Sequence, residues 1–326
     1  MKKQAKTILA RGSAVAAALL MTASAVAAET KTLGVSMPIL AGPWYTAILY
    51  GIETKAKELG YDIVVLDAGG YSNIDRQLSQ VQNLITQQVD AILVDPGNPS
   101  AFNGVAREAR GAGVPLIGVS SPIVASDVPP DGAVSSSHCT LGEMMAEGAE
   151  TILPEGGTIG VLAGPGGAFW AEERLRCFKE NVTESGIEIV AAQSTDQDVA
   201  IAMTTANDII QRFPDVTMLY AADDTYGIGA ARAVQQAGKC GEIKVLFAVL
   251  GEAAQDLMEQ GCVDYVVAQK PVTIGSQAVD LADKLISGSA ERGEVRTISP
   301  VAVYPDNLAE IDLTEIRQPS GWRPAN

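Results

Sequence analysis

The chain has little of the residues from which most catalytic and metal sites are built. Its 326 residues include one histidine, His138, and four cysteines, no two of which form a Cys-x-x-Cys pair. This composition excludes an ordinary zinc site of histidine and cysteine. The Gly-x-Ser-x-Gly elbow of serine hydrolases and the Gly-x-x-x-x-Gly-Lys-Ser/Thr phosphate loop are also missing. We therefore expect no enzyme, and no resident metal or cofactor.

Positive charge is scarce as well. The chain has 23 lysines and arginines against 39 aspartates and glutamates, which gives a formal net charge of −16. A negative charge of this size argues against nucleic acid and against anionic membrane surfaces as partners. It does not define the charge of a ligand, because side chains on solvated helix faces say little about a pocket.

Basic residues gather at the start of the chain, where residues 2–11 hold three lysines and one arginine. An apolar run at 14–21 and small residues at 25–28 follow. This is the pattern of a cleavable export signal, so we expect a signal peptide over residues 1–28 and a mature protein in the periplasm. The apolar run is too short to span a bilayer comfortably.

In the periplasm, the four cysteines would be in an oxidising compartment. Cys240 and Cys262 each precede a predicted strand. If these two strands are parallel neighbours, both cysteines lie at the same edge of the sheet, and the sequence leaves open whether they form a disulfide. Cys139 and Cys177 are expected to be two buried thiols and not a second bridge.

The remaining chain alternates strands and helices. Apolar runs begin near residues 33, 63, 91 and 115, a spacing typical of β-α-β units. These runs do not alternate with polar residues, which predicts strands buried on both faces of a parallel sheet. A proline- and serine-rich stretch at 120–130 breaks the rhythm. The pattern then restarts with a helix predicted to open at Thr140, with Glu143 completing a capping box. The sequence thus predicts two similar α/β halves.

Short motifs in order along nearly the whole mature chain show a family resemblance. They lie at 35–38, 43–45, 56–61, 89–93, 113–115, 221–224, 235–239 and 268–269. Together they resemble periplasmic sugar-binding proteins of the ribose/galactose type. The resemblance implies two doubly wound parallel-sheet domains joined by three hinge strands, the type I periplasmic binding protein fold. We expect an N-terminal domain of residues 29–136 plus 270–297 and a C-terminal domain of 137–269 plus 298–326.

The resemblance also implies a function. A protein of this kind is a monomeric solute-binding component of an ABC importer, which captures a sugar, polyol or related polar ligand by domain closure and delivers it to a membrane permease. A narrower similarity points to an alternative. Residues 67–72 and 320–324 resemble the periplasmic sensor protein that detects trimethylamine N-oxide. That protein signals to a membrane histidine kinase.

Trp44 and Tyr45 are the first candidates for ligand contact, because they follow the first strand and open a helix. Ligands of open α/β sheets bind beyond the carboxyl ends of the strands, and aromatic rings accept sugar C–H faces or cations. The residues alone leave open whether both rings belong to the core, whether Arg174 is a surface residue and whether Asp224 is only a helix cap. The ligand-binding residues that we expect, largely by resemblance, are Trp44, Tyr45, Tyr71, Ser120, Trp170, Arg174, Asp223 and Gln269.

The chain also departs from the family pattern. Ser120 and Ser121 stand where sugar binders present an acidic residue and an arginine, and residues 248–250 lack an expected aspartate. Gln197 occupies a ring-stacking position without a ring. Each sugar hydroxyl buried without a partner costs about 1–3 kcal/mol, so we expect a smaller or less hydroxylated ligand, or binding through serine and water. His138 is expected at the end of a hinge strand, in a structural or a ligand-facing role.

Overall fold

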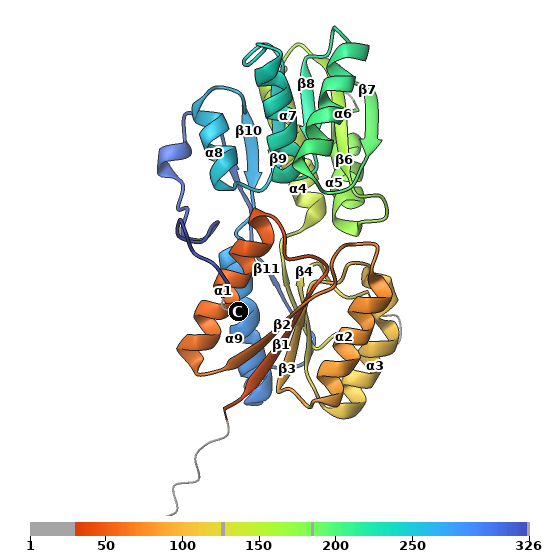
Figure 1. Ribbon diagram of the computed structural model, residues 1–326, viewed down its shortest axis with the longest axis vertical. Coiled ribbons are helices and arrows are strands. Elements are labelled where there is room, and N and C mark those ends of the chain that lie inside the picture. Colours follow the sequence, from red (N-terminus) through yellow and green to blue (C-terminus); the bar gives the residue numbers. More distant parts are fainter. Residues whose placement is uncertain (1–29, 125–127, 184–185, 325–326) are drawn as a thin grey trace, which may run out of the picture.

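The computed structural model describes residues 30–124, 128–183 and 186–324. The predicted signal peptide lies outside these ranges. The described chain forms two lobes, one above the other in Figure 1, each built on its own six-stranded sheet. The first sheet is entirely parallel and has the order β11-β5-β4-β3-β1-β2. Its strands are β1 (Thr32–Met37), β2 (Asp62–Asp67), β3 (Ala91–Val94), β4 (Leu116–Ser120), β5 (Gly132–Ser135) and β11 (Glu294–Thr297).

The second sheet has the order β12-β10-β9-β8-β6-β7. All its pairings are parallel except that of β12 with β10. Its strands are β6 (Gly157–Gly164), β7 (Ile187–Ser194), β8 (Met218–Ala221), β9 (Lys244–Ala248), β10 (Tyr265–Ala268) and β12 (Val301–Val303). Leu219 and Tyr220, adjacent in β8, are both fully buried but belong to different hydrophobic clusters. Both faces of this sheet are therefore covered, which confirms the predicted fold class.

Helices cover the two faces of each sheet (Figure 1). The first lobe has α1 (Pro43–Leu59), α2 (Ile74–Thr86), α3 (Asn103–Ala112), α9 (Pro271–Ile286) and the 3-10 turn η1 (Pro99–Phe102). The second lobe has α4 (His138–Ile152), α5 (Phe169–Asn181), α6 (Val199–Arg212), α7 (Asp224–Gln236) and α8 (Glu252–Glu259), with η2 (Leu308–Glu310) after β12. Over the described ranges, no helix combines the length and the apolar character that crossing a membrane requires.

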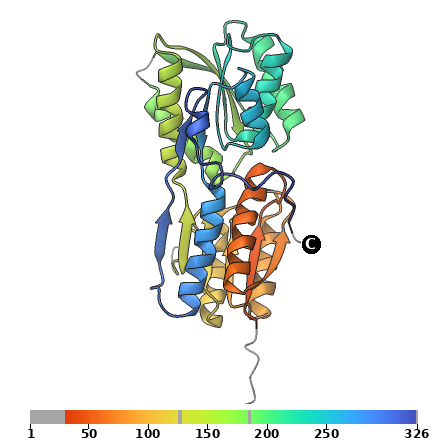
Figure 2. The same ribbon diagram turned by 90° about the vertical axis from the view of Figure 1, so that its left-hand side faces the viewer.

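The chain passes between the lobes three times, after β5, after β10 and between β11 and β12. Figure 2 shows these connections rising from the first lobe into the second. The Ser136 hydroxyl donates to the Ile298 carbonyl oxygen at 2.8 Å, which joins two of the connections. Helix α9 and strand β11 pack in the first lobe, whereas β12 completes the second sheet. The domain limits given above remain a prediction.

The helix after β5 begins earlier than predicted. Ser137 is its N-cap and accepts a hydrogen bond from the Thr140 backbone N–H at 3.1 Å, so the helix starts at His138. The prediction of a cap at Thr140 was wrong, because the serine three residues earlier already provides the cap oxygen. His138 and Cys139 consequently lie in the first turn of α4 and not on a strand.

Both pairs of cysteines are bonded. Cys139 of α4 and Cys177 of α5 form a disulfide with their Cα atoms 5.2 Å apart, so the prediction of two free thiols was wrong. Helical periodicity gave no sign of this bond, because it depends on the tertiary contact between the two helices. Cys240 and Cys262 form the second disulfide, at the amino-terminal ends of the neighbouring strands β9 and β10.

Candidate ligand-binding site between the lobes

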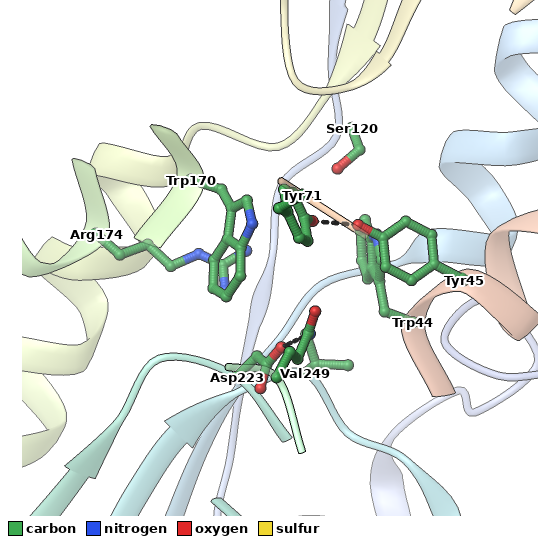
Figure 3. A pocket seen from close by; sticks show the side chains of 9 residues that line it. Trp44, Tyr45, Tyr71, Ser120, Trp170, Arg174, Asp223 and Val249 are labelled. Carbon is green, nitrogen blue, oxygen red and sulfur yellow. Dashed lines mark hydrogen bonds between the residues drawn. The ribbon is translucent and has the colours of Figure 1, made fainter. Parts of the chain in front are cut away.

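A cavity lies between the two lobes, beyond the carboxyl ends of strands in both sheets, where open α/β sheets bind ligands. Its empty volume is about 290 Å³, part of which opens to solvent, at the small end of the range for small-molecule sites. The side chains that line it come from both lobes (Figure 3). They are Trp44, Tyr45, Tyr71 and Ser120 from the first lobe and Trp170, Arg174, Gln197, Asp223 and Val249 from the second.

The structure brings together the residues that were predicted to form the site. All of them line the cavity except Gln269, which lies behind it and contacts Arg174. Gln197 and Val249 line the cavity although neither was predicted. Gln197 had been passed over because it carries no ring, and Val249 because it belongs to the segment without the expected aspartate. That these residues bind a ligand remains a prediction.

Four aromatic side chains dominate the cavity. Trp44 and Tyr45 follow Gly42, whose positive φ of 95° turns the chain into α1. Trp44 and Trp170 are 8% exposed, so the rings are at once buried and part of the cavity wall. Tyr71 reaches the site from the glycine turn after β2, where its hydroxyl is hydrogen-bonded to the Tyr45 hydroxyl. Burial raises the pKa of both tyrosines well above the ordinary range, so both keep their protons.

Among the residues that the structure describes, Arg174 is the only cation that lines the cavity, and it is 3% exposed, so the alternative of a surface residue is wrong. Its Nη1 donates to the Ala222 carbonyl oxygen at 2.8 Å, and its Nη2 donates to Gln269 Oε1 at 2.9 Å. The guanidinium carbon lies 4.8 Å from the ring centroid of Trp170, a cation–π distance. These contacts fix the plane of the guanidinium. Its Nε has no hydrogen-bond partner within the described chain.

Two adjacent aspartates follow β8. Asp223 caps α7 by accepting a hydrogen bond from the Tyr226 backbone N–H at 3.2 Å, and its other oxygen accepts one from the Gln197 amide. Asp224 is the first residue of α7 and not its cap, and its Oδ2 is buried without a hydrogen-bond partner in the described part of the chain. Burial raises the pKa of both carboxyls, and the charge of Asp223 adds to the effect on Asp224.

Asp95 is a third acidic residue at the site, and the sequence reasoning missed it. It directly follows β3 and is 4% exposed. Burial raises its pKa to about 8, against the opposing effect of hydrogen bonds from Ser120, Ser121 and Tyr45. The carboxyl expected after β4 is therefore replaced in part by one from the neighbouring strand. Its position after a buried strand was the available signal.

His138 does not line the cavity but lies behind Arg174. Its ring Nδ1 is 3.5 Å from Arg174 Nη2, and its Nε2 is 3.3 Å from the Ser121 hydroxyl. Burial first, and then the charge of Arg174, lower the pKa of His138 well below its ordinary value. The imidazole is therefore neutral, and its position supports a structural role beside the arginine.

Across the described ranges, one group of side chains is close enough to share a metal ion, namely Cys139, Glu173 and Cys177. Both sulfurs of this group belong to the disulfide, so they are not available as thiolate ligands. The group lies on α4 and α5 and does not line the cavity.

A second, larger hollow of about 830 Å³ of empty space lies beside α1, between α8 and the C-terminal tail. Pro43, Tyr50, Glu252 and the tail residues 313–314 and 317–320 contribute to its walls. The ring of Trp322 packs edge-on against Tyr50 nearby, with the centroids 5.2 Å apart. Arg174 and Asp223 of the inter-lobe cavity are buried, whereas the charged residues that line this hollow, Glu252 and Arg317, are exposed and half-buried. We therefore assign the ligand site to the smaller cavity.

Comparisons with known proteins agree with this architecture. A family model described as a periplasmic binding protein domain matches residues 33–290. The ribose import binding protein of Bacillus subtilis is 30% identical over 257 residues, which are 79% of this chain and 82% of that protein. A putative rhizopine-binding protein of Rhizobium meliloti is 28% identical over 305 residues, 91% of this chain and 96% of that protein.

Solved structures show the same fold. A sugar ABC transport substrate-binding protein from Bordetella parapertussis superposes with a TM-score of 0.82 at 22% identity, covering 91% of this chain and 96% of that one. A periplasmic solute-binding protein from Actinobacillus succinogenes, solved with bound D-allose, gives a TM-score of 0.81 at 24% identity and covers 86% and 100% of the two chains. At these identities the likeness establishes the fold alone.

Proposed function

Because the chain belongs to the periplasmic binding protein family, we propose that it is the solute-binding component of an ABC importer and acts in the periplasm. It would capture a small polar ligand between its lobes and present the closed form to a membrane permease. It binds its ligand and does not transform it. The monomer is the expected functional unit.

The observation that carries this proposal is the composition of the cavity wall. Residues from both lobes face one cavity, so a bound ligand would contact Trp44 on one side and Trp170 on the other. A ligand that touches both lobes stabilises their closed arrangement, because it gains contacts there that the open arrangement does not offer. The connections between the lobes are the natural place for the movement.

A sugar or polyol suits several of these groups. Arg174 donates hydrogen bonds, Asp223 accepts them and the indole faces offer a surface for sugar C–H groups. The relatives named above are described as binding ribose or rhizopine, and one structural neighbour holds D-allose. For this chain we propose the same broad class, a small hydroxylated compound.

A second candidate is favoured by the balance of aromatic and acidic groups. In the described part of the chain, four aromatic side chains line the cavity, and Asp95, Asp223 and Asp224 are buried around it, with Arg174 as the one cation in its wall. Aromatic faces with carboxyl groups nearby suit a methylated amine or an amine oxide. In that case the protein would be a sensor, and its closed form would signal to a membrane histidine kinase.

A thermal-shift screen tests the proposal. The probes are D-ribose, D-allose, myo-inositol, glycerol and trimethylamine N-oxide, each up to millimolar concentration. A ligand at 100 times its Kd adds about 2.7 kcal/mol of stability and raises the Tm by about 4 °C in a protein of about 300 residues. Trp170→Ala should abolish the shift, whereas Trp322→Ala, which removes a tryptophan outside the cavity, should retain it. Equal shifts in both variants would place binding elsewhere.

Two further measurements separate the candidates. The Kd of a cationic methylated amine that pairs with aspartates should rise with ionic strength, whereas the Kd of a sugar, or of an amine oxide without net charge, should not. The liganded protein should stimulate ATP hydrolysis by its permease in proteoliposomes if it serves an importer. Stimulation of kinase autophosphorylation instead would establish the sensor.

A further inference from the structure

The disulfide between Cys139 and Cys177 lies one helical turn from the arginine of the site. Cys177 follows Arg174 by three residues on α5, and Cys139 directly follows His138 on α4. The disulfide and the contact between His138 and Arg174 therefore lie next to each other where α4 meets α5. Arg174 Nη2 is 3.5 Å from His138 Nδ1.

The helices are also in backbone contact at this point. A Cβ atom built on Gly142 would lie 2.2 Å from the Arg174 carbonyl oxygen and 3.0 Å from the Phe178 nitrogen. Only glycine permits this approach. Gly142 lies one turn after Cys139, so the closest crossing of α4 and α5 and the disulfide are adjacent. The backbone around Arg174 is thus held by two neighbouring contacts with α4, the disulfide at Cys177 and the close approach of Gly142.

The same bond reaches the connection between the lobes. Helix α4 begins two residues after Ser136, whose hydroxyl donates to the Ile298 carbonyl oxygen of another connection. Whatever angle the lobes adopt about these connections, the disulfide fixes the start of α4 to α5. Arg174 is then carried as part of the second lobe and cannot shift on its own.

We propose that the Cys139–Cys177 disulfide positions Arg174, so that its guanidinium stays in the cavity wall against Trp170, with Gln269 behind it. The inference rests on the proposed function for its meaning, because the position of Arg174 matters only if the cavity binds a ligand. Its test uses no ligand, so the two proposals can fail separately.

The chain offers a matched control. The Cys240–Cys262 disulfide is in the same lobe but joins the amino-terminal ends of β9 and β10, whereas the cavity lies beyond the carboxyl ends. The two bonds span 38 and 22 residues. The loop entropy that a disulfide removes grows slowly with loop length, so both bonds should contribute similar stability. If removing the two bonds affects the cavity differently, the difference then reflects where each bond lies and not how much stability it contributes.

The readout is the fluorescence of Trp170, because the guanidinium of Arg174 covers its ring at 4.8 Å. In a chain with Trp44→Phe and Trp322→Phe, Trp170 is the sole tryptophan. In the Cys139→Ser/Cys177→Ser variant we expect acrylamide to quench Trp170 about twofold more strongly, since local loosening uncovers the ring. The Cys240→Ser/Cys262→Ser variant should match the parent chain.

A cycle with Arg174→Lys separates positioning from general loosening. If the disulfide acts through Arg174, its removal should add little quenching in the Arg174→Lys background. Equal quenching in the two disulfide variants, or full additivity with Arg174→Lys, would overturn the proposal. Should the Cys139/Cys177 variant fail to fold, Gly142→Ala keeps the bond but forces the helices apart, and it must then raise the quenching. An unchanged Trp170 in that variant would also overturn the proposal.

Discussion

Asp95 offers a test of the electrostatics of the cavity. It is a buried carboxyl whose pKa is raised to about 8, compared with about 3.9 in an unfolded chain. Between these two values the folded protein holds a proton that the unfolded chain has released. Stability must therefore fall as the pH rises through this window. The substitution Asp95→Asn removes the titrating group and keeps a neutral side chain of the same shape.

The magnitude follows from the linkage of protons to folding. One proton gives a slope of about 1.4 kcal/mol per pH unit, so Asp95 lowers the free energy of unfolding by up to about 4 kcal/mol between pH 5 and pH 8. Asp223 and Asp224 titrate in the parent and in the variant alike. The difference between the two profiles therefore isolates Asp95.

Urea unfolding, followed by circular dichroism at pH 5, 6, 7 and 8, measures this difference. We expect the parent to lose stability relative to Asp95→Asn as the pH rises, with most of the change between pH 5 and pH 8. The control Asp306→Asn removes a carboxyl from the exposed surface instead. Parallel profiles for the parent and Asp95→Asn would refute the assignment of Asp95 as a buried, protonated group.

Two further substitutions test the packing around the site. Arg174→Lys should lower the free energy of unfolding by about 1–3 kcal/mol, because one ammonium cannot reach both acceptors of the guanidinium and one buried acceptor is left unpaired. Denaturant titration measures this loss, and an unchanged midpoint would contradict it. Gly51→Ala should cost about 1–3 kcal/mol, since a Cβ there would lie 2.2 Å from the Val272 carbonyl oxygen where α1 meets α9. The same substitution at Gly104, where nothing lies within 4 Å of a built Cβ, should cost much less, and equal losses would refute the close contact.

Much of the architecture could be predicted from the sequence because its signals are local. Continuous apolar runs identify the parallel strands: 91–94 is the fully buried β3, whereas 63–66 lies in the half-buried edge strand β2. The residues after each strand identify the edge where a ligand is expected to bind. Trp44 and Asp223 were placed in this way, with the family resemblance selecting among the candidates, whereas Arg174, which lies within a helix, was placed by the resemblance alone. The structure brings these three side chains to one cavity.

What the sequence could not provide depends on contacts between distant elements. The Cys139–Cys177 bond requires α4 and α5 to cross at Gly142, and no periodicity encodes that crossing. Asp95 was missed because its importance comes from Ser120 and Ser121, at the end of the neighbouring strand β4 and directly after it. Gln269 was placed in the wall, but it holds Arg174 from behind, which only the side-chain geometry reveals.

The central claim is that a small polar ligand binds between the lobes. The most direct test is a crystal structure of the protein with the compound that raises its Tm most in the screen. The account predicts that this compound lies between Trp44 and Trp170 and within hydrogen-bond distance of Arg174 or Asp223. A compound found instead in the hollow beside Tyr50 and Glu252, with the inter-lobe cavity empty, would contradict the account.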